Sequence, residues 1–189
     1  MIDLKQETET IIKHLKRGGI ILYATDTVWG LGCDATNEEA IENLLKLKKS
    51  PSNKSMLCLV SDFKMLQQYV EDIPEVAYDV LKYAKKPTTI IYDNPIRVSE
   101  RLIADDNTLG IRVVRDAFVN KLLKKFKKPI VSTSANFSGK SAPFKYQDID
   151  PKIIEAADYI SQVPSASKHK KPSAIIKISM DSKVKVIRE

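Results

Sequence analysis

The sequence predicts an α/β fold in a single domain, residues 1–189, built on a twisted mixed parallel and antiparallel sheet flanked by helices. Short apolar runs that suit buried strands alternate along the chain with segments whose apolar residues recur at helical spacing. A chain of 189 residues can bury one sizeable core, and no linker, repeat or low-complexity tract divides it. Small polar residues follow several apolar runs, which predicts a concave, positively charged cleft lined by strand ends.

The individual helices and strands are predicted from stripes of apolar residues and from residues that typically begin or end a helix. Ile11, Ile12 and Leu15 share one face of a helix that Gly18 ends as a C-cap. Thr36 and Glu39 are spaced as a capping box, which predicts that a second helix starts at Thr36. By the same criteria, helices are expected at 7–17, 36–47, 62–69, 74–83, 116–126 and 151–157, and strands at 20–23, 56–60, 88–92, 109–114, 129–131, 159–162, 174–178 and 184–187.

Residues 23–35 are the most informative stretch of the chain. After the apolar run at 20–23, Thr25, Asp26 and Thr27 place two hydroxyls and a carboxylate at the end of a strand. Gly30 and Gly32 follow, where the chain can bend tightly or let a ligand approach its backbone. The stretch is therefore interpreted as a ligand-binding loop, and an ordinary turn after a strand is the alternative.

A second polar loop, residues 132–139, follows the short strand at 129–131. Its serines, threonine and asparagine can present oxygens and backbone N–H groups to an anion. The alternative is a Ser/Thr-rich turn that satisfies its own backbone.

Charge and composition limit the kinds of ligand, metal site and location that the chain can have. The net charge of +7, from 31 basic and 24 acidic residues, suits phosphate-bearing ligands or RNA, although a solvated basic surface gives the same count. Cys33 and Cys58 lack the spacing of metal ligands, so we expect reduced, buried thiols and no metal site. No apolar run is long enough to span a membrane, and the charged N-terminus does not read as a signal peptide, so we expect a cytoplasmic protein.

Several blocks together resemble the YrdC-like family, the threonylcarbamoyl-adenylate synthases of tRNA modification. Residues 23–35 resemble the family's Tyr-Pro-Thr-(Asp/Glu)-Thr-Val-Tyr-Gly-Leu-Gly signature, with Ala24 and Trp29 in place of its proline and second tyrosine. The other blocks occur in the family's order, and the resemblance covers nearly the whole chain. They lie at 108–113 (Thr-Leu-Gly-Ile-Arg-Val), 129–139 (ending Ser-Ala-Asn-Phe-Ser-Gly), 172–176 (Pro-Ser-Ala-Ile-Ile) and 186–188 (Val-Ile-Arg).

The resemblance implies a nucleotidyltransferase that makes threonylcarbamoyl-AMP and pyrophosphate from L-threonine, bicarbonate and ATP with Mg²⁺, for modification of adenosine 37 in tRNAs. Partners would then include tRNA or double-stranded RNA and a threonylcarbamoyl-transfer complex. Lys48 and Arg112 would be catalytic, and Arg112 would pair with the substrate carboxylate or with the carbamate. The threonine site implied by family position is Thr25, Thr27, Arg112, Thr133 and Asn136, and the ATP site is Lys48, Lys54, Thr108, Ser134, Ser138, Ser173 and Arg188.

One departure from the family concerns ATP binding. The family has Lys-x-Arg-Pro before its phosphate loop, and this chain has Lys48 but Ser50 where the arginine should stand. We expect Lys48 and Lys54 to share the work of the missing arginine, although a lysine is a point charge and not a bidentate fork. Lysines near a helix C-terminus are alternatively explained by the helix dipole and solvation.

Two other functions remain open from the sequence. The lysines between 121 and 128 would suit a non-catalytic YrdC-like module that binds tRNA or double-stranded RNA, and a solvated helix face is the plainer explanation. Carbamoyl transfer to another acceptor, as in the related domain of hydrogenase-maturation proteins, is the second alternative. That domain normally sits in a much longer chain.

Overall fold

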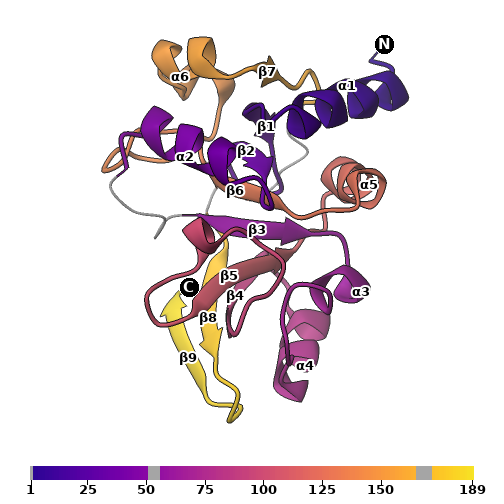
Figure 1. The fold of residues 1–189 in the computed structure, drawn as a ribbon, viewed down its shortest axis with the longest axis vertical. Helices are drawn as coiled ribbons and strands as arrows, with labels where there is room; N and C mark the ends of the chain where they lie inside the picture. The colour runs from indigo at the N-terminus through magenta and orange to yellow at the C-terminus, as the bar shows by residue number, and fades with distance from the viewer. Residues whose placement is uncertain (1, 51–55, 165–171) are drawn as a thin grey trace.

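The computed structural model describes residues 2–50, 56–164 and 172–189. Its centre is a twisted sheet of nine strands in the order β7-β1-β2-β6-β3-β5-β4-β8-β9, which mixes parallel and antiparallel pairs (Figure 1). The predicted α/β fold with a mixed sheet is therefore confirmed. The strands are β1 (Ile21–Ala24), β2 (Trp29–Asp34), β3 (Leu57–Val60), β4 (Thr88–Asp93), β5 (Thr108–Val113), β6 (Ile130–Ser134), β7 (Tyr159–Ile160), β8 (Ala174–Ile178) and β9 (Val184–Arg188).

Helices cover both faces of the sheet. Ile21 and Tyr23 on β1 pack with α1 and α5 in one apolar cluster, whereas Leu22 belongs to a second cluster with α2, α4 and α6. Because neighbouring residues of a strand point to opposite faces, the two clusters lie on opposite sides of the sheet. The helices are α1 (Leu4–Lys16), α2 (Glu38–Leu47), α3 (Phe63–Leu66), α4 (Glu75–Tyr83), α5 (Ala117–Phe126) and α6 (Pro151–Ala156), with 3₁₀ turns η1 (Glu100–Leu102) and η2 (Tyr146–Asp148).

Residues 29–34 contain no bend at Gly30 or Gly32, so the expectation of a tight bend there is wrong. These residues form β2, antiparallel to β1, and the chain reverses earlier, between Ala24 and Trp29. A Cβ atom on Gly32 would lie 2.6 Å from the Val131 carbonyl oxygen and 2.9 Å from Tyr23 Cε1. This glycine therefore permits close packing inside the sheet, and it does not serve to bend the chain.

Several predicted helix boundaries also move. Helix α1 begins at Leu4 because Asp3 caps it, accepting hydrogen bonds from the Lys5 and Gln6 N–H groups. Helix α2 is capped by Asn37 and not by Thr36, whose hydroxyl instead donates to Asp34 Oδ1 at 2.7 Å. Helix α3 is a single turn, shorter than the predicted 62–69. Asp62 and Asp116 cap α3 and α5, at the residues where two of the expected helices were to begin.

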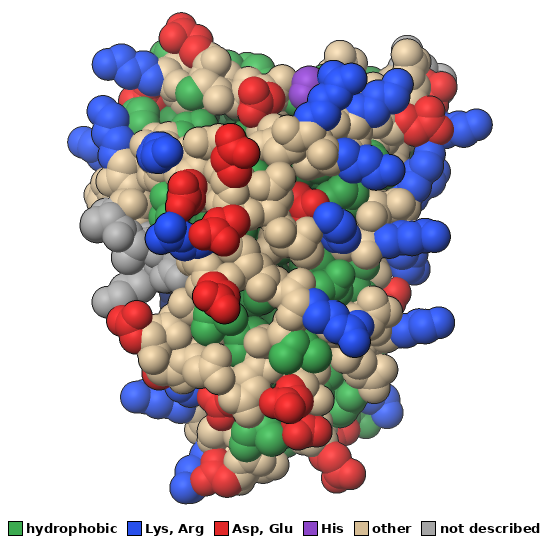
Figure 2. Space-filling view, in the orientation of Figure 1, with side chains coloured by type: hydrophobic (Ala, Val, Ile, Leu, Met, Phe, Trp, Pro, Cys, Tyr) green, Lys and Arg blue, Asp and Glu red, His purple; other side chains and the backbone are tan. Residues whose placement is uncertain are grey.

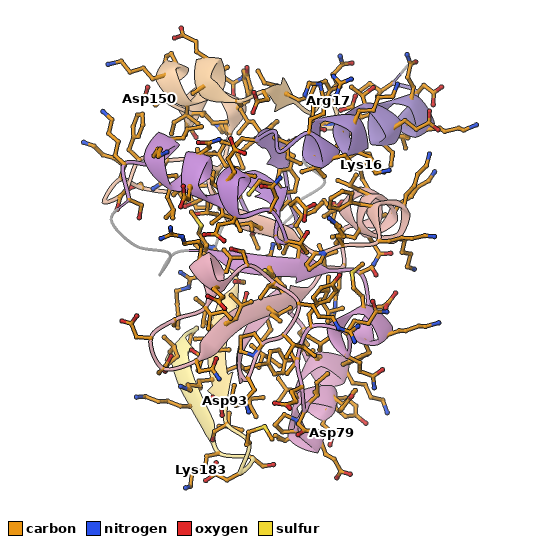
Figure 3. The ribbon with its side chains drawn as sticks, in the orientation of Figure 1. Lys16, Arg17, Asp79, Asp93, Asp150 and Lys183 are labelled. Atoms are coloured by element: carbon orange, nitrogen blue, oxygen red, sulfur yellow. The ribbon has the colours of Figure 1, made fainter. Side chains whose placement is uncertain are left out.

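Figure 3 shows side chains at the two ends of the molecule. Asp150 lies at the start of α6, where its side chain accepts a hydrogen bond from the Lys152 N–H group. At the other end, Asp93 closes β4 and accepts a hydrogen bond from the Met180 N–H group at 3.1 Å, beside the turn between β8 and β9 that carries Lys183. Within the described residues, no helix combines the length and the apolar character that crossing a membrane requires.

Candidate active site

The strand ends surround a cavity of about 500 Å³. Leu57 on β3 and Ser132 on β6 line it. Two residues away on the same strands, Leu59 and Ile130 pack in the cluster with α1 and α5. The cavity therefore lies on the same face of the sheet as α1 and α5, next to the area that these two helices bury. The described lining residues include no Asp or Glu, and they are Thr25, Thr27, Val28, Gly30, Met56, Leu57, Thr89, Ile91, Leu102, Ala104, Thr108, Leu109, Gly110, Arg112, Ser132, Thr133, Ser134, Lys140, Ala142, Pro172, Ser173, Ile175 and Arg188.

The turn between β1 and β2 brings two hydroxyls to the cavity. Thr25 Oγ1 lies 2.8 Å from the Val28 carbonyl oxygen, to which it donates, and 3.0 Å from Thr27 Oγ1. The Thr27 N–H group also donates to Thr25 Oγ1, at 3.2 Å. These local bonds fix the turn, so both threonines are held in place at the cavity wall. That this turn binds a ligand stays a prediction.

Arg112 on β5 is a buried cation in the cavity wall. It is 3% exposed, its Nη2 lies 3.1 Å from Asp26 Oδ1, and its Nη1 donates to Thr27 Oγ1 at 3.5 Å. The sequence predicted that Arg112 pairs with the carboxylate of a substrate, and the structure adds a carboxylate from the chain itself. This ion pair lowers the cost of burying the guanidinium. Arg112 Nε is buried and has no hydrogen-bond partner among the described residues.

The end of β6 supplies the opposite wall. Thr133 and Ser134 line the cavity, and the buried Thr133 Oγ1 has no hydrogen-bond partner in the described part of the chain. Asn136 and Ser138, which the sequence also placed at the site, are not among the described lining residues. The Asn136 amide instead holds the following loop, because its Nδ2 donates to the carbonyl oxygens of Phe137 at 3.0 Å and Lys140 at 2.7 Å.

Lys48 lies behind this wall, at the end of α2. It is 2% exposed, and its Nζ donates to the carbonyl oxygens of Ser134 at 2.6 Å and Asn136 at 2.8 Å. Burial lowers the pKa of Lys48 to about 8. The lysine does not belong to the described cavity lining, so the structure shows it holding the end of β6. Lys54, the second predicted phosphate contact of this segment, lies outside the described residues.

The remaining predicted ATP contacts lie together on the far wall. Thr108, at the start of β5, lines the cavity and donates to Asp106 Oδ1 at 2.7 Å. Ser173 and Arg188 also line the cavity, and the Ser173 carbonyl oxygen accepts from Arg188 Nε at 3.1 Å and Nη2 at 2.9 Å. Burial, with a smaller contribution from nearby Arg112, lowers the pKa of Arg188.

The cavity thus unites most of the predicted site residues and leaves some apart. Thr25, Thr27, Thr108, Arg112, Thr133, Ser134, Ser173 and Arg188 line it, whereas Lys48, Asn136 and Ser138 do not. Sequence reasoning missed Thr89 and Lys140. Thr89 sits at the start of an apolar strand and Lys140 directly follows the 132–139 loop, but neither position stands out without the fold.

Comparison with known proteins identifies the family to which the chain belongs. A family model named Sua5_yciO_yrdC and described as "Telomere recombination" matches residues 13–189. The chain belongs to the Sua5/YciO/YrdC family. Relatives in this family include proteins named threonylcarbamoyl-AMP synthase from Vibrio vulnificus (strain YJ016), 36% identical over 70% of this chain and 73% of the relative, and from Pseudoalteromonas translucida (strain TAC 125), 32% identical over 92% and 93%.

Solved structures of the Sua5/YciO/YrdC family share the fold. Escherichia coli YciO superposes with a TM-score of 0.84 at 23% identity and covers 100% of this chain and 91% of its own. A crystal structure of Pyrococcus abyssi Sua5 complexed with L-threonine superposes with a TM-score of 0.84 at 22% identity. This chain spans 52% of that Sua5 chain, which is about half of its length.

Proposed function

We propose that this member of the Sua5/YciO/YrdC family is a threonylcarbamoyl-AMP synthase. It joins L-threonine, bicarbonate and ATP to give threonylcarbamoyl-AMP, pyrophosphate and water. The observation that carries the proposal is one cavity whose lining brings together Arg112, Arg188, Thr25 and Thr133. Support comes from relatives named for this activity at 32–36% identity and from a Sua5 structure that binds L-threonine.

The threonine end of the reaction fits the wall around Arg112. The amine of threonine first takes up bicarbonate or carbon dioxide to form a carbamate, so the bound substrate carries two anionic groups. Arg112 would pair with one of them while Asp26 holds the guanidinium from behind. Thr25 and Thr27, which also line this wall, would bound the rest of the threonine substrate.

The nucleotide end fits the far wall of Thr108, Ser173 and Arg188, together with Ser134 at the end of β6. A carbamate oxygen attacks the α-phosphate, the bond to the β-phosphate breaks, and pyrophosphate leaves. No covalent enzyme nucleophile is needed, because positioning in line and stabilisation of negative charge supply the catalysis. The described lining offers cations and hydroxyls but no carboxylate, so Mg²⁺ would enter as MgATP, held by the triphosphate.

The product would pass, in the cytoplasm, to a threonylcarbamoyl-transfer complex that modifies adenosine 37 of tRNAs. The alternative of a non-catalytic RNA-binding module is not favoured by the relatives. Figure 2 shows Lys and Arg side chains along the side formed by α1 and α5, interspersed with acidic ones. Lys125 pairs there with Glu9 at 2.8 Å and Lys128 with Asp34 at 2.7 Å, so part of this basic cluster is neutralised within the chain.

Pyrophosphate release tests the proposal. With MgATP present, release should require both L-threonine and bicarbonate, and it should fall to background when either is omitted. A pure RNA-binding module would release none under any condition. Release that continues without threonine would indicate an unrelated nucleotide hydrolysis.

A further inference from the structure

The far wall of the cavity holds a pair of hydroxyl groups that the sequence did not connect. Thr89 Oγ1, on β4, and Ser173 Oγ, just before β8, lie 2.8 Å apart. The two residues are 1% and 3% exposed, and both line the cavity. Ser173 is one of the predicted ATP contacts, whereas nothing in the sequence gave a role to Thr89.

Local packing fixes the direction of the Thr89 hydroxyl. A threonine side chain has few allowed rotamers because it branches at Cβ. A Cβ atom on Gly110 of the neighbouring strand β5 would lie 3.3 Å from Thr89 Cγ2, so the methyl group uses the space that Gly110 leaves. With the methyl group on that side, the hydroxyl lies toward Ser173.

The same serine also anchors Arg188. Its carbonyl oxygen accepts two hydrogen bonds from the guanidinium, at 3.1 Å and 2.9 Å. A hydrogen-bonded chain therefore runs from Thr89 on β4 through Ser173 to Arg188 on β9, and all three residues line the cavity. Displacement of Ser173 would move both a hydroxyl and a cation of the site.

Counting protons shows what the pair requires. Two hydroxyls carry two protons, and one of these lies between the two oxygens. Among the described residues, no acceptor is hydrogen-bonded to the second proton. A buried hydroxyl without an acceptor is costly, and the nearby cations of the cavity, Arg188 and Arg112, favour an anionic oxygen as that acceptor.

We propose that Thr89 is a positioning residue that orients Ser173, so that the pair presents one O–H donor to an anionic oxygen of a substrate. The inference rests on the proposed synthase function and adds to it a residue outside the recognised motifs. Two substrates carry such an oxygen, namely the triphosphate of ATP and the carboxylate or carbamate of threonine. The experiment separates these two sources.

Three variants test the role of the hydroxyl. Thr89→Val keeps the shape and removes the hydroxyl, and Thr89→Ser restores it. Thr88→Val is the matched control, because Thr88 is the neighbouring residue, points to the other face of the sheet and donates to the Lys86 carbonyl oxygen at 3.0 Å. Calorimetry should measure MgATP and L-threonine separately, and pyrophosphate release should give kcat and KM.

We expect Thr89→Val to weaken binding of one of the two ligands about tenfold, the lower end of what a hydrogen bond to a charged group contributes. The KM for that ligand should rise while the KM for the other stays unchanged. Thr89→Ser should come close to wild-type affinity, and Thr88→Val should match wild type.

Wild-type affinity of Thr89→Val for both ligands would overturn the inference. Equal weakening for both ligands, with a lowered Tm and no rescue by Thr89→Ser, would also overturn it, since the pair would then serve only the packing of the sheet. Failure of the synthase function itself looks different, because the wild-type protein would then bind neither MgATP nor threonine.

Discussion

Replacing Lys48 with methionine should destabilise the protein, although the change removes a buried charge. The ammonium group is hydrogen-bonded to the carbonyl oxygens of Ser134 at 2.6 Å and Asn136 at 2.8 Å. The Ser134 carbonyl also accepts from the Asn136 N–H group, so it keeps a partner in the variant. The Asn136 carbonyl would lose the only partner that it has among the described residues.

The expected magnitude follows from these bonds. A buried acceptor left unsatisfied costs about 1–3 kcal/mol, and a hydrogen bond from a charged donor contributes about 1.5–3 kcal/mol. The variant does not have to bury a charged ammonium group, and this gain offsets part of the loss. We therefore expect the free energy of unfolding to fall by about 2 kcal/mol, which for a chain of 189 residues lowers Tm by about 4–8 °C.

Urea denaturation followed by circular dichroism measures the change at pH 7. Lys46→Met is the matched control, because Lys46 is an exposed lysine in the last turn of the same helix, α2. If Lys48→Met were as stable as wild type and only lost affinity for ATP, Lys48 would act at the nucleotide, and its role in holding the end of β6 would be refuted.

The lowered pKa of Lys48 also predicts that the free energy of unfolding depends on pH. Burial lowers its pKa from 10.5 to about 8, so between these values the unfolded chain binds more protons than the folded one. The contribution of Lys48 to stability is therefore lowest below about pH 8 and rises toward pH 10.5. The difference in unfolding free energy between wild type and Lys48→Met should grow over this range, and a constant difference would contradict the lowered pKa.

Three further predictions concern the site and the sheet. Arg112→Lys should raise the KM for threonine nearly as much as Arg112→Ala in steady-state assays, because both lose the bidentate fork, and a wild-type KM would refute the assignment. The pocket of Thr25, Thr27 and Thr133 should accept serine as the nearest competitor, since one methyl group is worth about 1–3 kcal/mol, and equal turnover of leucine in the same assay would exclude that pocket. Gly32→Ala should cost about 1–3 kcal/mol in urea unfolding, because the added Cβ would lie 2.6 Å from the Val131 carbonyl oxygen, and unchanged stability would contradict that packing.

Much of the fold was predictable because burial leaves a periodic pattern. Helix α5 follows its apolar stripe and its Asp116 cap, and β4 and β8 follow short segments rich in isoleucine. Strand β2 was missed because two glycines separate its apolar residues and it contains no β-branched residue. Its packing depends on partners from β1 and β6, which the sequence does not place beside it.

The site was predictable where its residues end strands. Thr25 and Thr27 were singled out because their hydroxyls follow an apolar run, whereas Thr133 was implied by the resemblance to the family. The partners of Lys48 were not, since Ser134 and Asn136 lie 86 and 88 residues further along the chain. Contacts over such separations are set by the topology of the sheet, and no local pattern in the sequence encodes them.

The proposed function requires that one cavity joins threonine, bicarbonate and ATP. The most direct test incubates the protein with L-threonine, MgATP and ¹³C-bicarbonate, then identifies products by mass spectrometry. The synthase function predicts threonylcarbamoyl-AMP that carries a single ¹³C atom, formed together with an equal amount of pyrophosphate. A threonine adenylate that carries no ¹³C would contradict it. Cleavage of ATP to ADP and phosphate without any threonine adduct would also contradict it.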